Sequence, residues 1–213
     1  MNKLFNPENP VMRLLTFLCD MMYINLLFLL TSLPLFTIGA SLTAMYSVLF
    51  KRIRNEDPSI AKAYFSAFKQ NFKQSTLFWL PSSFLIVFLS IDVYIAHNHI
   101  GDGLSFLQYP IAILIFIILA IIIYIFPQLA AFDTPSKQVL KNAVLLSLAN
   151  FPTTIFVFAV HIFLILLADL SATMLFIVLS IMMFLGIATM YYFFTLFFRR
   201  IFNKLIGGEE DAV

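Results

Sequence analysis

The sequence predicts an all-α polytopic membrane protein, and three observations support this prediction. Of the 213 residues, 62% are hydrophobic and only 11% are charged, whereas average soluble proteins carry about 25% charged residues. Long apolar runs recur along the chain, and roughly 20 apolar residues in a helix suffice to cross the hydrocarbon core of a bilayer. The basic residues gather in short segments between these runs, as membrane topology requires.

Composition also narrows the function classes. A formal net charge of +2 gives no case for a nucleic acid as partner. Cys19 is the single cysteine, so an intrachain disulfide or a thiolate metal cluster is impossible. The chain has no P-loop, H-E-x-x-H, G-x-S-x-G or paired-carboxylate motif, and these are the patterns that would indicate catalysis. We therefore expect no enzyme activity, no catalytic residues, no metal and no cofactor.

The first apolar run, Leu14–Phe50, is 37 residues long. As one helix it would measure roughly 55 Å, against a hydrocarbon core of about 30 Å. Pro34 and Gly39 stand where a break is needed, since Pro removes a helix hydrogen bond and Gly tolerates a turn. We expect a full span over about 12–34 and a second helix over about 40–54, which re-enters the bilayer or lies along its surface.

A basic segment follows, from Lys51 to Lys73. It contains six basic residues but only two acidic ones, Glu56 and Asp57. Since Lys and Arg near span ends are held on the inner side of the membrane, the segment is predicted to be a cytoplasmic loop. Its basic residues are candidates for binding anionic headgroups or a protein partner: Lys51, Arg52, Arg54, Lys62, Lys69 and Lys73.

Part of this segment is predicted to form an interfacial helix over about 58–74. Asp57 suits the N-cap and Pro58 the first helical position. On a helical wheel the aromatic residues occupy one arc and the lysines the opposite arc. This pattern predicts aromatics inserted at the acyl boundary and lysines directed to anionic headgroups.

The rest of the chain is predicted to form four more spans and one more interfacial helix, and residues 1–213 are predicted to form a single membrane domain. A polar turn without Lys or Arg around His97 and His99 is expected outside, and Asp169–Ser171 forms a second outer turn. Aromatic residues followed by Arg199 and Arg200 are typical of a cytoplasmic exit, before a short acidic tail. The expected spans are about 75–96, 107–131, 152–168 and 173–197, and the expected interfacial helix is about 136–150.

All basic clusters lie on one side if 51–73, 133–150 and 199–204 are cytoplasmic. The chain then sits in the membrane with its C-terminus on the cytoplasmic side. The side of the N-terminus depends on the helix at 40–54. If that helix returns through part of the bilayer, Lys3 and Arg13 are inside, as the charge rule favours. If only 12–34 crosses, they are outside.

Two polar residues fall within predicted spans. Asp20 lies in the first span, and a carboxylate at bilayer depth is costly unless it is paired or hydrated. It is therefore a functional candidate, with a position near the headgroups or a hydrogen bond to another helix as the alternatives. His161 lies near the middle of a span and is a candidate proton or ligand contact, although membrane histidines often serve helix–helix hydrogen bonds.

A short internal repeat is also visible. Pro58-Ser59 leads through a helix to Asn71-Phe72 and a span, and Pro135-Ser136 leads to Asn150-Phe151 and a span. Duplicated units of this kind occur in transporters. The alternative is the chance similarity of apolar helices.

Two motifs carry a family resemblance. The segment G-A-S-L-T-A-M-Y at 39–46, with F-S-A-F-K-Q-N-F-K-Q at 65–74, resembles the YesL family of bacterial membrane proteins. This family has no known molecular function and is often encoded beside carbohydrate ABC-transporter genes. The resemblance implies a non-enzymatic accessory or scaffold protein for carbohydrate uptake, with a carbohydrate ABC transporter permease as partner. The alternative is a small transporter or permease subunit with a pathway near Asp20, His161 and the break at Pro34–Gly39.

Overall fold

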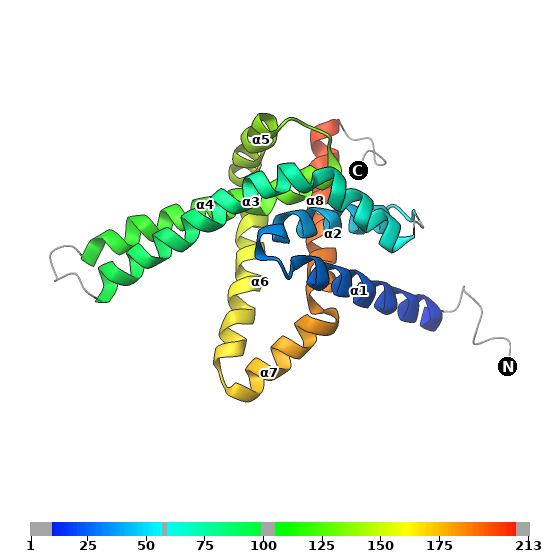
Figure 1. Ribbon diagram of the computed structural model, residues 1–213, viewed down its shortest axis with the longest axis horizontal. Coiled ribbons are helices and arrows are strands. Elements are labelled where there is room, and N and C mark those ends of the chain that lie inside the picture. Colours follow the sequence, from blue (N-terminus) through cyan, green and yellow to red (C-terminus); the bar gives the residue numbers. More distant parts are fainter. Residues whose placement is uncertain (1–9, 57–58, 99–104, 208–213) are drawn as a thin grey trace.

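The computed structural model describes residues 10–56, 59–98 and 105–207, and within these ranges every regular element is helical (Figure 1). The predicted all-α class is confirmed. Five helical segments are long and apolar enough to cross a membrane: Pro10–Ser32, Ile60–Asn98, Gln108–Ala131, Phe151–Asp169 and Ala172–Leu205. The expected cap at Asp57 and Pro58, the turn residue His99 and the acidic tail from 208 onward lie outside the described residues.

The first apolar run breaks where proline predicts it. Helix α1 covers Pro10–Ser32 and α2 covers Ile38–Ile53, with the single 3-10 turn Leu35–Thr37 between them. Thr37 closes this turn, because its hydroxyl donates to the carbonyls of Thr31 and Pro34. Helix α2 ends at Ile53, and Asn55 just beyond it takes a left-handed conformation with φ 58°, a conformation that Asn tolerates better than most residues.

The boundary expected between an interfacial helix at 58–74 and a span at 75–96 is absent. Helix α3 runs without interruption from Ile60 to Asn98, 39 residues, and passes straight through Pro81. At 1.5 Å per residue it is roughly 58 Å long, almost twice the hydrocarbon core. No Gly or Pro lies between 59 and 80, so nothing in the local sequence ends the helix before the apolar part begins. The lysine-bearing segment is thus a rigid extension of the span.

The second half contains α4, Gln108–Ala131, then α5, Ser136–Ala149, and α6, Phe151–Asp169. Here the chain does break at the Asn-Phe pair. Asn150 is outside the helical conformation, with φ −115° and ψ 41°, and α6 begins at Phe151 with Pro152 in its first turn. The equivalent pair at 71–72 is followed by Lys and stays inside α3. The two copies of the short repeat therefore have different structures.

The last predicted span is not one regular helix. Helix α7, Ala172–Ile181, leads into a π-helical segment, Met182–Gly186, and then α8, Ile187–Ile206. The chain changes direction at this segment (Figure 1). A turn precedes α7, as predicted. Ser171 is the N-cap of α7, and its hydroxyl accepts from the Met174 N–H at 3.2 Å.

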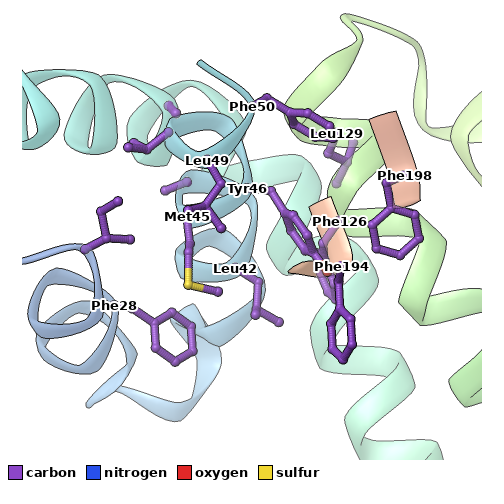
Figure 2. Packing of buried hydrophobic residues seen from close by; sticks show 14 of the residues in the cluster. Phe28, Leu42, Met45, Tyr46, Leu49, Phe50, Phe126, Leu129, Phe194 and Phe198 are labelled. Atoms are coloured by element: carbon purple, nitrogen blue, oxygen red, sulfur yellow. The ribbon is translucent and has the colours of Figure 1, made fainter. Parts of the chain in front are cut away.

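Helix α2 is the centre of the core. It packs against α1, α3, α4 and α8, and from Gly39 to Phe50 every residue except Ser47 is buried. Figure 2 shows side chains of α2 meeting Phe28 of α1, Phe126 of α4 and Phe198 of α8. The small residues of the 39–46 motif explain this close packing. A Cβ on Gly39 would lie only 2.7 Å from the Trp79 Cβ and 2.9 Å from the Ser75 carbonyl oxygen of α3.

Two helical pairs leave this centre in different directions. In Figure 1 α3 and α4 run side by side toward the left, whereas α6 and α8 run downward and are joined below by α7. Tyr124 ties the two pairs together, because its hydroxyl on α4 lies 3.1 Å from the Thr154 hydroxyl of α6 and donates to the Asn150 carbonyl at 3.2 Å. Away from the centre, the helix faces expose mainly large apolar side chains.

Candidate functional site

Asp20 and Arg52 form an ion pair between α1 and α2. Their side chains are 17% and 23% exposed, so the pair is partly shielded from solvent. The contact requires α2 to run back beside α1, which brings the end of the second helix level with the middle of the first. Asp20 thus takes the paired arrangement that makes a carboxylate tolerable in an apolar segment, and it holds the α1–α2 hairpin in register.

The remaining basic candidates divide into two groups. Arg54 is half-buried and pairs with Glu56, with Nε 2.8 Å from the Glu56 carboxylate, and Lys51 is also half-buried. Both lie at the end of α2. In contrast, Lys62, Lys69 and Lys73 are all exposed on α3. The three lysines are spaced by seven and four residues, which places them on one face of a helix.

The opposite face of α3 packs on protein and not on the acyl boundary, contrary to the expectation for this segment. Ala63, Tyr64 and Ala67 are buried. The Tyr64 hydroxyl lies 2.7 Å from the Thr31 hydroxyl and donates to the Ser41 carbonyl at 3.2 Å. Only Phe65 of the aromatic arc is well exposed, at 44%. This part of α3 is thus amphipathic as predicted, and its apolar face packs against the buried helix α2.

His161 lines a cavity of about 440 Å³ at the junction of the two helical pairs. The walls come from α4 and α6, and the inner end is formed by residues of α1, α2, α3 and α8. Apolar side chains dominate the lining. Ile38, at the start of α2 and directly after the break, also contributes. His161 and the break region are therefore brought together, whereas Asp20 is not among the lining residues.

The orientation of the His161 ring is set by its own helix. Nδ1 lies 2.8 Å from the Val157 carbonyl oxygen. A carbonyl oxygen can only accept, so Nδ1 carries the proton and donates, which leaves Nε2 of the neutral ring as an acceptor. The ring stacks on Phe194, with centroids 5.6 Å apart. His161 is thus held in place with one nitrogen still available.

Two tyrosines that the sequence analysis did not single out complete the polar lining. Tyr46 of α2 is only 3% exposed. Its ring lies edge to face against that of Tyr191 of α8, with the ring centroids 5.4 Å apart. The ring of Tyr191 also lies edge to face against that of His161, with the ring centroids 6.4 Å apart. Within the described part of the chain, neither hydroxyl has a hydrogen-bond partner. Tyrosines in membrane segments are too common for sequence alone to mark these two.

A further polar residue missed from the sequence is Asn25. It is fully buried on α1, and its amide donates to the carbonyls of Met182 and Met183 at 3.0 and 2.7 Å. Its Oδ1 accepts from the Ala188 N–H at 2.9 Å. Asn25 thereby satisfies backbone groups at the start of the π-helical segment and just beyond its end, where the regular ladder is interrupted. The sequence did offer one sign of this role, since Asn25 is a polar amide in the middle of an apolar run.

The chain is similar to known proteins, but the matches carry no described activity. Residues 21–93, about a third of the chain, match a family described as "Protein of unknown function, DUF624". This stretch covers the second half of α1, all of α2 and most of α3. No solved structure matches the chain.

Among curated proteins, the chain is similar to "Uncharacterized protein YteU" of Bacillus subtilis (strain 168), with 28% identity over 145 residues. The match covers 66% of this chain and 64% of the relative, so the chain spans less than two thirds of that protein's length. Both comparisons place this multi-helical chain beside proteins of unknown function.

Proposed function

We propose that this chain is a non-enzymatic accessory or scaffold protein of the bacterial cytoplasmic membrane. The segment 51–73 and the C-terminus face the cytoplasm in this proposal, in agreement with the charge rule. The Asp20–Arg52 contact supports the alternative in which the N-terminal segment is also inside, because α2 returns beside α1 toward the side where α1 begins. The chain then has six membrane segments, one of them the buried helix α2.

One observation carries the accessory role: the lysine face of α3 is exposed, while its opposite face is buried against α2. Lys62, Lys69 and Lys73 project from a rigid, continuous helix. No ion pair with another described residue occupies them. Such a face is preorganised for an acidic partner surface, since the helix does not have to fold on binding.

The partner we propose is a permease subunit of a carbohydrate ABC transporter. The support is the resemblance of the 39–46 and 65–74 motifs to the YesL family, whose genes often stand beside such transporters. Anionic headgroups are the second ligand of the same face, because polybasic segments attract them by about 1 kcal/mol per Lys near the surface.

The test is affinity purification of the tagged protein from its native membrane in mild detergent, in cells growing on a polysaccharide. A stoichiometric permease subunit should copurify with the unaltered protein. Replacing Lys62, Lys69 and Lys73 by Gln should reduce its recovery about tenfold, if each exposed pair contributes about 0.5 kcal/mol.

The matched control replaces Lys137 and Lys141, which are exposed on α5, by Gln. This control should leave recovery unchanged. Purification of the chain without any permease, or equal losses in both variants, would refute the docking proposal.

A small transporter or permease subunit is the second candidate, and the cavity beside His161 is the observation that favours it. In that case His161→Ala should abolish complementation of a deletion strain, while the α3 lysine variant still complements. Asp20 is no longer required for such a pathway, because it is paired with Arg52 and does not line the cavity.

A further inference from the structure

The cavity at the junction of α4, α6 and α8 has the features of a binding site for a small amphiphile. We propose that it binds a neutral, hydroxyl-bearing molecule with a single apolar chain, taken from the lipid phase. The site does not depend on the docking role proposed above, since none of the α3 lysines lines the cavity.

The size of the cavity limits the ligand. Its volume of about 440 Å³ lies within the range of small-molecule sites, roughly 300–1,000 Å³. At about 30 Å³ per water-sized group, it holds on the order of 15 non-hydrogen atoms. A single chain of medium length fits this volume, whereas a two-chain phospholipid does not.

The lining determines the chemistry of the ligand. Apolar side chains such as Leu42, Ile122 and Val157 form most of the wall and favour a hydrocarbon chain. Apart from Trp79, whose N–H is bonded to the Leu35 carbonyl, the polar side chains of the lining form one corner: the Tyr191 ring centroid lies 5.4 Å from that of Tyr46 and 6.4 Å from that of His161. Each of these side chains retains hydrogen-bonding capacity, because His161 uses only Nδ1 on its own helix and the two hydroxyls have no partner among the described residues.

A hydroxyl group is complementary to this corner. It can donate to Nε2 of His161 and accept from a tyrosine hydroxyl at the same time. A charged headgroup is disfavoured, because no Lys, Arg, Asp or Glu lines the cavity and an isolated ion in an apolar site is costly. A sugar is disfavoured as well, since three polar side chains cannot satisfy its many hydroxyls.

Entry from the lipid phase is consistent with the exposure of the α6 rim. Ile162 and Ile165 line the cavity and are 52% and 67% exposed. The opening therefore faces outward between apolar side chains of a candidate membrane span. An amphiphile dissolved in the bilayer can reach the polar corner without crossing an aqueous phase.

The fluorescence of Trp79 can report whether the cavity is occupied. Trp79 is the chain's single tryptophan, lines the cavity, and is held by a hydrogen bond from Nε1 to the Leu35 carbonyl at 2.8 Å. We would titrate the detergent-solubilised protein with 12-bromododecan-1-ol, which has about the number of non-hydrogen atoms that the cavity holds. Bromine quenches tryptophan fluorescence on contact, so binding is followed directly.

Saturable quenching that is reversed by excess dodecan-1-ol is the expected result. The matched probe is 1-bromododecane, which partitions into the micelle but lacks the hydroxyl, and it should bind about three- to tenfold more weakly. Tyr191→Phe and His161→Phe should each weaken binding of the bromoalcohol by the same factor. His97→Phe, a histidine that is exposed and bonded to Gln108, is the control and should change nothing.

Leu119→Phe adds a test that leaves the polar corner intact. This residue lines the cavity from α4, and a larger side chain should reduce the saturable quenching by filling the space. Quenching that does not saturate, or that is equal for the two brominated probes and unchanged in the Leu119 and His161 variants, shows partition into the micelle only. Either result would overturn the proposed site.

Discussion

Asn25 offers the sharpest test of the tertiary structure. Replacing it by Leu keeps a branched side chain of similar length but removes the amide, which makes three hydrogen bonds to the chain around the π-helical segment. The carbonyls of Met182 and Met183 and the N–H of Ala188 then lose their side-chain partner in a region where water is scarce. We expect α1 and the α7–α8 junction to separate more readily in this variant.

The magnitude follows from the number of bonds. Hydrogen bonds between membrane helices contribute about 0.6 kcal/mol each on average and up to about 1.7, so three bonds correspond to about 2–5 kcal/mol. The lower end applies if the π-helical segment relaxes, because the Ala188 N–H could then bond to a carbonyl of its own helix. We therefore predict a loss of at least about 2 kcal/mol in the free energy of unfolding.

The assay is equilibrium unfolding in mixed micelles of a mild detergent with increasing SDS, followed by far-UV circular dichroism. The control is Asn98→Leu, because Asn98 is exposed and its one hydrogen bond to a described residue is to the Tyr94 carbonyl of its own helix. If Asn25→Leu lowers the unfolding free energy no more than Asn98→Leu does, Asn25 does not join α1 to the π-helical segment and the packing described above is refuted.

Two further predictions concern the α1–α2 hairpin and its contact with α3. Asp20→Asn should lower the free energy of unfolding by about 1–3 kcal/mol, because Arg52 stays partly buried without its carboxylate, and adding Arg52→Gln should restore part of the loss. Strictly additive effects in this double-mutant cycle would contradict the ion pair. Gly39→Ala should cost about 1–3 kcal/mol through overpacking, since its Cβ would lie 2.7 Å from that of Trp79, whereas Ser47→Ala, at the half-buried position of α2, should have little effect. An unchanged unfolding curve for Gly39→Ala would contradict the close approach of α2 and α3.

Local sequence was sufficient for most of the helical elements. The break after α1 was predictable because Pro34 cannot continue a hydrogen-bonded ladder, and the turn at Ser171 because a Ser N-cap stands between two apolar runs. The expected spans at 107–131 and 152–168 agree closely with α4 and α6. These features depend on hydrophobic run length and backbone chemistry, which are properties of neighbouring residues.

The partners of the polar residues were beyond sequence reasoning. Asp20 and Arg52 were assigned to different roles, one within the membrane and one in a basic loop, because nothing local shows that α2 returns beside α1. The continuity of α3 was missed for a related reason. Its change from amphipathic to apolar character resembles a boundary, but the helix continues because its first part has α2 to pack against.

The sequence by itself determined the class of this protein: an all-α chain with helices long enough to cross a membrane, and basic residues clustered between them. Amino-acid composition and the length of the apolar runs decide these properties, because a segment that crosses a bilayer must form its backbone hydrogen bonds internally and is therefore helical. Only the tertiary structure decided that α2 is buried at the centre, that Asn25 supports the π-helical segment, and that His161, Tyr46 and Tyr191 line one cavity. Each of these contacts joins residues far apart in the chain, and packing geometry alone brings them together.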